Sequence, residues 1–386
     1  MKKALIVGGS NGIGLSIGKN LEEKGYHIIV CDMVEVKENV LKNYTYYPCN
    51  LLEFDDTLFD TLSRDYEIEM VMITAGYGRV TPFKYIHPSE IGRMMDVNAT
   101  AGMKIARYFY HRLNNKKDFY FGIMVSIAAM MSSPLFSVYS ASKASLYRFI
   151  EAINIELEKD GSTNRILNVS PSSISGTAFI GGNTDLDALK SLSLDIIEHL
   201  FNKDELFIPG YEPTLKGVLE RYNKDPHEYG LHSYDYKMES GRVVEKPMVK
   251  IGYLSGTFDL FHVGHLNLLK RAKSQCDYLI VGVHKDASHK NKETFIPFEE
   301  RKAIVGACRY VDKVVQSEKE DSDAMFKYHA NRLFVGSDYK GTEKFLRYEE
   351  MFKDTDIKII YFPYTQGTSS TQIRKTVMVK SKDLNK

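Results

Sequence analysis

The chain has 386 residues, 43% hydrophobic and 26% charged, which is a composition typical of globular proteins, and its length predicts two or three domains of about 150 residues. Lys and Arg total 51 against 50 Asp and Glu, and the resulting net charge of +1 argues against a nucleic-acid-binding protein. Four cysteines without a C-x-x-C pair favour a reducing, cytoplasmic compartment, and the longest weakly polar stretch, residues 122–131, is too short to insert into a membrane.

Strands and helices are predicted to alternate in two successive units. The first unit is expected to have strands at 3–7, 27–31, 69–74, 119–126 and 165–170, and helices near 13–24, 53–64, 88–114 and 139–159. The second is expected to have strands at 249–254, 277–283, 312–315, 332–335 and 357–362, and helices near 264–273, 298–308 and 342–352. This alternation predicts an α/β protein with a parallel sheet in each unit. We expect domains at 1–245 and 249–386, with a polar bridging segment from about 201 to 246 that is helical near 213–222.

A glycine-rich turn follows the first predicted strand. Gly8, Gly12 and Gly14 form G-x-x-x-G-x-G before a helix, where glycines let the backbone approach a pyrophosphate bound at the helix N-terminus. Asp32 ends the second strand, where its carboxylate can bind an adenosine ribose and would repel a 2′-phosphate. Alone, the motif could be a glycine-rich turn without a ligand. Together with Asp32 it favours NAD(H), with NADP(H) as the alternative.

Tyr139 and Lys143 form Y-x-x-x-K, and the i,i+4 spacing places both on one face of a helix. A phenol with a pKa near 10 is a poor base at neutral pH unless a cation such as Lys143 stabilises its phenolate. By itself the pair would more often lie on a solvated helix face. Here it follows Ser126, at the end of an apolar strand, and Asn98 in the sequence DVNAT, which together favour a catalytic site.

Residues 1 to about 240 resemble the short-chain dehydrogenase/reductase family, through GGSNGIG, TAG at 74–76, Asn98, Ser126, YSASK at 139–143 and the later SPSSISGT. The resemblance implies that Tyr139 is the general acid/base and that Lys143 lowers its pKa and holds the nicotinamide ribose. It also implies that Ser126 polarises the substrate carbonyl and that Asn98 holds a water molecule. The chain departs from the family pattern at Asn50, Thr74 and Ser172. The implied cofactor site comprises Gly8, Ser10, Asn11, Gly12, Ile13, Gly14, Asp32, Asn50, Leu51, Ala75, Gly76, Tyr139, Lys143 and Thr177.

The second unit opens with GTFDLFHVGH at residues 256–265. His262 and His265 flank Gly264 where a strand is expected to lead into a helix. Two imidazoles beside free helix N–H groups can donate hydrogen bonds to a phosphate as negative charge develops on it. A zinc site is the alternative use of a histidine pair, but no further ligand stands at the required spacing, so no metal ligand is assigned. Two structural histidines are the other alternative.

Residues 249 to about 376 resemble the cytidylyltransferase family that includes glycerol-3-phosphate cytidylyltransferase. The resemblance rests on GTFDLFHVGHLNLLKRAK, on ERK at 300–302, RYVDKVV at 309–315 and VGSDYKG at 335–341, and on the late GTSSTQIRK. It implies that His262, His265 and Lys292 act in catalysis and that Asp259 supports a loop or the metal. Tyr364 stands where the family has a phosphate-binding Arg, a role that Arg374 or Lys375 could take over. The implied nucleotide and substrate site comprises Gly256, Thr257, Phe258, His262, His265, Lys290, Lys292, Arg309, Asp338, Ser369, Ser370 and Thr371.

Together the two resemblances imply two Rossmann-like domains in tandem in one bifunctional enzyme. We expect the first domain to reduce a keto-sugar or keto-polyol phosphate with NAD(P)H. The second would then transfer a cytidylyl group from CTP, with Mg²⁺, to the polyol phosphate, giving a CDP-polyol for cell-surface polymers. The alternatives are one catalytic half beside a binding module, or a reductase for an unphosphorylated or nucleotide-linked substrate. The partners expected are small molecules, and both families commonly form dimers or tetramers.

Overall fold

The computed structural model describes residues 1–177, 179, 183–246, 248–286, 293–363 and 372–373. The chain divides into two compact units, Met1–Pro247 and Met248–Lys386, which are described separately below. Within the described residues, no helix combines the length and apolar character needed to cross a membrane.

The first unit contains a parallel sheet whose strand order is β3-β2-β1-β4-β5-β6-β7. The order reverses between β1 and β4, and ligands of open α/β sheets bind beside such a reversal, at the carboxyl ends of the strands. The five strands expected from the sequence are present. Two edge strands were not predicted, because β3 is only half-buried and β7 has two residues. The strands are β1 Lys3–Val7, β2 His27–Asp32, β3 Tyr44–Pro48, β4 Ile68–Ile73, β5 Tyr120–Met124, β6 Ile166–Val169 and β7 Leu206–Phe207.

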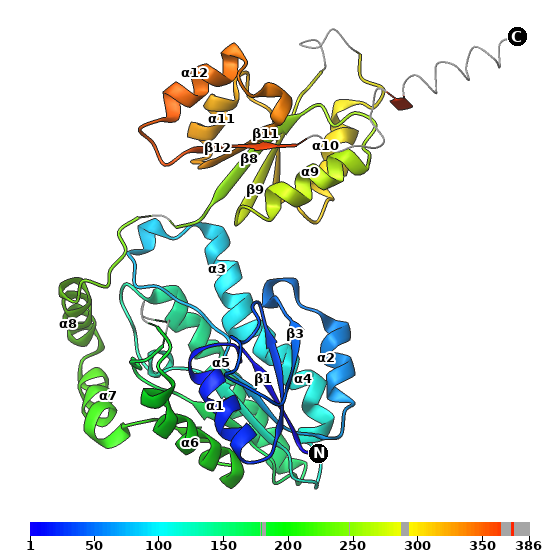
Figure 1. Cartoon of the computed structure of the whole chain (residues 1–386). Helices are drawn as coiled ribbons and strands as arrows, with labels where there is room; N and C mark the ends of the chain where they lie inside the picture. Colours follow the sequence, from blue (N-terminus) through cyan, green and yellow to red (C-terminus); the bar gives the residue numbers. More distant parts are fainter. Residues whose placement is uncertain (178, 180–182, 247, 287–292, 364–371, 374–386) are drawn as a thin grey trace, which may run out of the picture. The chain divides into compact units, whose positions relative to one another are not determined.

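Helices cover both faces of this sheet (Figure 1). One face packs against α1 and α6, and the other against α2, α4 and α5, so that each face has its own apolar core. Two further helices, α7 and α8, form about half of the bridging segment and pack within the first unit; α7 overlaps the helix expected near 213–222, and α8 was not predicted. The helices are α1 Gly12–Glu23, α2 Asp56–Ser63, α3 Pro88–Met95, α4 Ala101–Leu113, α5 Ser137–Lys159, α6 Leu186–Asn202, α7 Lys216–Lys224 and α8 Pro226–Glu239.

The prediction of a single helix over 88–114 is wrong in one respect. A π-helical turn, Asp96–Thr100, separates α3 from α4. Such turns occur frequently at functional sites, and this one contains Asn98. A second difference is α6, which was not predicted and lies largely within residues 172–200, the segment with the weakest pattern in the first half of the chain.

The second unit has a parallel sheet of order β10-β9-β8-β11-β12, with the reversal at the central strand β8. Helices α9 and α10 pack on one face, while α11 and α12 pack on the other (Figure 1). Of these elements only the short α11 was not predicted. The strands are β8 Ile251–Gly256, β9 Tyr278–Val283, β10 Lys313–Gln316, β11 Arg332–Gly336 and β12 Lys358–Phe362, and the helices are α9 Val263–Lys273, α10 Phe298–Gly306, α11 Asp321–Lys327 and α12 Glu343–Phe352. Both units are Rossmann-like, as expected.

Candidate active sites

The glycine-rich turn links β1 to α1 at the reversal of strand order. Gly8 has a φ of +87°, and a Cβ atom there would lie 2.5 Å from the backbone nitrogen of Ala75. A Cβ atom on Gly14 would overlap the Gly8 carbonyl oxygen. Gly12 has a φ of +52°, but no described atom lies within 4 Å of its Cβ position. The first and third glycines are therefore required by close packing, and the second lies beside open space at the helix N-terminus, as a pyrophosphate site requires.

Neighbouring residues complete this turn. Asn11 is the N-cap of α1, and its side chain accepts a 3.1 Å hydrogen bond from the Gly12 N–H. The same N–H donates to the hydroxyl of Thr184, a contact that the sequence analysis missed because Thr184 is remote in the chain. Ile13 packs on the apolar core beneath α1. The Thr74 hydroxyl donates to the Gly8 carbonyl at 2.9 Å, so Thr74, one of the departures from the family pattern, ties the end of β4 to the turn.

Asp32 lies beside the turn, as the cofactor hypothesis requires. One carboxylate oxygen accepts a hydrogen bond from the Ser10 N–H at 3.0 Å, and the other from the Met33 N–H at 2.7 Å. The Ser10 hydroxyl donates to the Val34 carbonyl at 2.5 Å, which closes the loop after β2 against the turn. The Asp32 side chain is thus fixed at the sheet edge where the cofactor hypothesis expects the adenosine ribose.

We expect Asp32→Ala to let NADPH compete with NADH. The variant removes the charge that would repel a 2′-phosphate and the acceptor that would bind a free ribose hydroxyl. Steady-state kinetics with both cofactors measure the preference ratio, and Asp187→Ala, at an exposed acidic residue on α6, is the control. A wild-type protein that already prefers NADPH would contradict this role of Asp32.

The remaining predicted cofactor residues have structural contacts at the same sheet edge. Asn50 caps the turn after β3 by accepting a hydrogen bond from the Leu52 N–H at 3.1 Å, and Leu51 is buried. The Ala75 N–H donates to the Val7 carbonyl at 3.0 Å. Thr177 is also buried, and its hydroxyl donates to the Ile174 carbonyl within the loop after β6.

Asn98 and Lys143 meet at Gly76. A Cβ atom on Gly76 would lie 3.2 Å from both the Asn98 Oδ1 and the Lys143 Nζ. Asn98 accepts a hydrogen bond from the Tyr77 N–H at 2.9 Å and donates to the Tyr77 carbonyl at 2.8 Å and to the Ser142 hydroxyl at 3.1 Å. Both of its N–H groups are therefore engaged, and only one lone pair of Oδ1 is left for the water molecule that the resemblance implies.

Tyr139 is buried near the start of α5. It forms a hydrogen bond with Ser126, and the Phe136 ring stacks on it with the ring centroids 4.1 Å apart. Burial raises the pKa of Tyr139 to about 12, with the bond to Ser126 opposing this rise. Lys143 Nζ lies 5.9 Å from the centre of the Tyr139 ring and donates to the Met124 carbonyl at 2.8 Å. Burial thus has the largest effect on the phenol pKa, the phenol remains a proton donor, and a lowering of this pKa by Lys143 stays a prediction.

Sequence reasoning missed three residues around this phenol. Phe136 stacks on it, the Phe179 ring centroid lies 5.4 Å from that of Tyr139, and Gly78 lets the backbone approach the ring. Burial also lowers the pKa of Lys143, to about 8. Gly78, the second glycine of GYG at 76–78, was the one sequence signal for the close approach of this backbone to the Tyr139 ring.

The second site lies at the carboxyl end of β8. His262 is the N-cap of α9, and its Nδ1 accepts a hydrogen bond from the Gly264 N–H at 3.0 Å. Burial lowers the pKa of His262, so the neutral ring carries its proton on Nε2, where it can be donated to a phosphate oxygen. The rings of His262 and His265 stack with their centroids 4.0 Å apart.

A loop with unusual backbone geometry leads into this helix. Phe258 and Leu260 have φ values of +52° and +51°, in the left-handed region that side chains with a Cβ atom rarely adopt. Phe258 is buried, and its ring centroid lies 5.3 Å from that of His265. The Gly256 carbonyl accepts a hydrogen bond from the His284 N–H at 2.9 Å. Strained conformations persist where the surroundings hold them, and they are concentrated at functional sites.

Arg301 and Asp259 hold the loops that surround the histidines. Arg301 is 0% exposed and donates to the carbonyls of Thr257, His284, Lys285 and Ile296 at 2.5–2.9 Å. Asp259 accepts hydrogen bonds from the backbone N–H groups of Phe295 and Ile296 at 3.0–3.1 Å. Of the two roles considered for Asp259, loop support is the one these contacts show. Arg301 entered the sequence prediction only as part of the ERK motif at 300–302 and was given no role, because an arginine in a helix is usually exposed.

We expect Arg301→Met to abolish cytidylyl transfer while the first unit stays folded. The substitution keeps a similar length but leaves buried carbonyls without donors, at a cost of about 1–3 kcal/mol for each group. Transferase assays and thermal unfolding followed on the full chain measure the effect. Lys302→Met, at the next position of the same helix, is the control. Transfer at the wild-type rate in Arg301→Met would show that these loops need no such support.

Two other predicted residues differ in their placement. A Cβ atom on Gly336, at the carboxyl end of β11, would collide with the Asp338 carboxylate, so Asp338 lies on the same sheet edge as His262. Arg309 is exposed, precedes β10 and donates to the hydroxyl of Tyr310. It therefore lies at the amino ends of the strands, and this unit does not bring it to the histidine pair. The predicted Lys290, Lys292, Ser369, Ser370 and Thr371 lie outside the described residues, as do Tyr364, Arg374 and Lys375.

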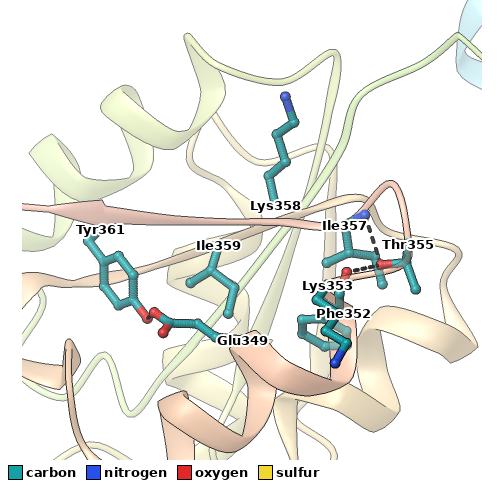
Figure 2. A pocket seen from close by; sticks show the side chains of 8 residues that line it. All are labelled: Glu349, Phe352, Lys353, Thr355, Ile357, Lys358, Ile359 and Tyr361. Carbon is teal, nitrogen blue, oxygen red and sulfur yellow. Dashed lines mark hydrogen bonds between the residues drawn. The ribbon is translucent and has the colours of Figure 1, made fainter.

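A shallow cavity of about 350 Å³ in the second unit is separate from this site. Figure 2 shows its lining from α12 and β12, with the Tyr361 hydroxyl donating to the Glu349 carboxylate at 2.7 Å. Lys353, Thr355 and Lys358 lie where α12 turns into β12, at the amino ends of the strands. The histidines lie at the carboxyl ends, so the cavity is not assigned to the chemistry.

Comparisons with known proteins match each unit separately. The family model for short chain dehydrogenase matches residues 2–185, and that for cytidylyltransferase-like proteins matches residues 253–376. Glycerol-3-phosphate cytidylyltransferase of Bacillus spizizenii is 39% identical over 125 residues, covering 31% of this chain and 91% of that protein. The Bacillus subtilis protein with the same description is 32% identical over 126 residues, covering 32% and 92%. A short-chain dehydrogenase structure from Streptomyces avermitilis has a TM-score of 0.49 at 16% identity and covers 61% of this chain and 98% of that one.

Proposed function

Because the chain belongs to the cytidylyltransferase-like family through its second unit and carries a short chain dehydrogenase domain in its first, we propose that it makes a CDP-polyol in two steps. The first step reduces a keto-sugar or keto-polyol phosphate. The second couples the resulting polyol phosphate to CTP and releases pyrophosphate. The phosphate group links the steps, since it is unchanged by the reduction and becomes the nucleophile of the transfer.

The state of Tyr139 supports reduction as the direction of the first step. A phenol with a pKa of about 12 is protonated at neutral pH, so it can donate a proton to a carbonyl oxygen that becomes an alkoxide. Ser126, hydrogen-bonded to the phenol, can donate to the same oxygen and so orient the carbonyl. The open Gly12 turn and the Asp32 carboxylate suit a nicotinamide dinucleotide, which supplies the hydride when bound.

The second step needs donors for the charge that develops on the phosphates. His262 presents its Nε2 proton beside the N-terminus of α9, and His265 stacks against it. The substrate phosphate would attack the α-phosphorus of CTP in line, and no covalent intermediate with the protein is needed. Mg²⁺ bound to CTP would neutralise part of the charge on the leaving pyrophosphate. We propose that Lys292 adds a further cation.

A product assay on the full-length protein tests the proposal. The protein is given CTP, Mg²⁺ and NADH with a panel of triose, tetrose and pentulose phosphates, and CDP-linked products are identified by mass. We expect one panel member to give a CDP-polyol only when both nucleotides are present. Absence of any reduced or CDP-linked product across the panel would contradict the function. If no member of the panel is reduced but a polyol phosphate supplied directly gives a CDP-linked product, catalysis would be restricted to the second unit.

A further inference from the structure

Two loops of the first unit pack against the Tyr139 ring. Phe136, at the end of the loop 131–136, stacks on it at a centroid distance of 4.1 Å. Gly78, in the loop 77–81, comes so close that a Cβ atom there would lie 2.5 Å from a ring carbon of Tyr139. The position of the phenol therefore depends on both loops.

The two loops are bound to each other. The Thr81 N–H donates to the Leu135 carbonyl at 2.6 Å. Leu135 has a φ of +62°, a conformation that a leucine keeps only where its surroundings hold it. The two loops are therefore joined by a direct backbone hydrogen bond beside the phenol.

A strap, defined here as residues 225–246, holds the loop 131–136. It comprises α8 and the segment that follows. Lys237 Nζ donates to the Ser133 hydroxyl at 2.7 Å, to the Pro134 carbonyl at 2.8 Å and to the Ser233 hydroxyl at 3.1 Å. These three bonds use all the N–H groups of the ammonium, so Lys237 has a structural partner for each and none left for a substrate phosphate.

The end of the strap holds the loop 77–81. The Val244 N–H donates to the Val80 carbonyl at 2.9 Å, and the Thr81 hydroxyl donates to the Val244 carbonyl at 2.6 Å. Thr81 is 1% exposed. It thus joins the strap through its side chain and Leu135 through its backbone.

We propose that the strap positions the proton donor of the reductase site, with Lys237 and Thr81 as the positioning residues. The strap lies outside both regions matched by the family models, 2–185 and 253–376, so neither match assigns it a role. Neither residue touches the reacting atoms. Each acts through the loops, and misplacing a reacting group by 1 Å can cost about 10²-fold in rate. The proposal rests on the proposed reductase function.

Paired substitutions in the full-length protein test this role. We expect Lys237→Met and Thr81→Val to lower kcat for reduction by about 10²-fold, with the KM for NADH unchanged and cytidylyl transfer unchanged. Lys237→Arg and Thr81→Ser keep the donors and should restore most of kcat. Lys224→Met, at an exposed lysine on α7, is the matched control. Wild-type kcat in both Lys237→Met and Thr81→Val would overturn the proposal, even if their melting temperatures fall.

Hydrogen exchange separates this proposal from the proposed function. The amides of residue 133 and residues 135–140 should exchange faster in Lys237→Met than in Lys224→Met, and this measurement needs no substrate. If the wild type reduces no member of the panel, the proposed function fails, and faster exchange still supports the strap as the element that holds the loop. Unchanged exchange at 133–140 would overturn the strap proposal whatever the activity.

Discussion

Tyr139→Phe is expected to lower NADH-dependent reduction by about 10²–10⁴-fold, the range that a general acid usually contributes. The ring keeps its stacking on Phe136, so the loss reports the hydroxyl and not the packing. Pyrophosphate release from CTP should continue at the wild-type rate when a polyol phosphate is supplied, because that chemistry belongs to the other unit. NADH absorbance and pyrophosphate release, measured on one preparation, check the reduction and the transfer separately.

Tyr147→Phe, at a half-buried tyrosine of the same helix, is the control. Near-normal reduction by Tyr139→Phe would remove the phenol from the mechanism.

The pH profile of the wild type adds a second check on this site. A phenol with a pKa of about 12 stays protonated through pH 10, so Tyr139 itself should cause no loss of reduction over that range. Lys143 has a lowered pKa of about 8, so its positive charge is present below pH 8 and is lost above it. If that charge is needed, kcat/KM, which reports the free enzyme, should fall as the pH rises through about 8.

His265→Ala is expected to lower cytidylyl transfer by about 10²–10³-fold while reduction and the folded state are kept. His265 lies in the first turn of α9, stacked on His262, where a donor gains strength as negative charge moves toward the leaving pyrophosphate. Losing an interaction that is stronger in the transition state than in the ground state lowers kcat rather than substrate binding alone. CTP turnover and thermal unfolding are measured on the same preparation.

The alternative for His265 is a purely structural role, and the two outcomes differ. A structural histidine would lower the melting temperature of the second unit, with activity lost only through unfolding. His329→Ala, at a histidine remote in sequence from the helix-cap motif, is the control. A stable and fully active His265→Ala protein would contradict the transferase assignment.

Short-range patterns in the sequence predicted most of what forms within a few residues. The G-x-x-x-G-x-G turn, the i,i+4 pair of Tyr139 and Lys143, and the pair of His262 and His265 where β8 leads into α9 each depend on local spacing. Alternating apolar strands and amphipathic helices predicted both parallel sheets, because buried strands and helix stripes have distinct periods. Of the elements that were missed, β3, β7 and α11 are short or only partly buried, whereas α6 and α8 are longer helices in segments without a clear pattern.

The sequence by itself therefore determined the two units and, for the glycine-rich turn and the histidine pair, the sheet edge at which the motif lies. Only the tertiary structure decided the pKa values of the groups in these motifs and the hydrogen bonds that hold the surrounding loops. The raised pKa of Tyr139 comes from burial by Phe136 and its neighbours, and Arg301 is held by carbonyls of three separate segments. The strap joins Lys237 to Ser133 across 104 positions of the chain. Burial and hydrogen bonds over such separations follow no local period, so no sequence pattern could have revealed them.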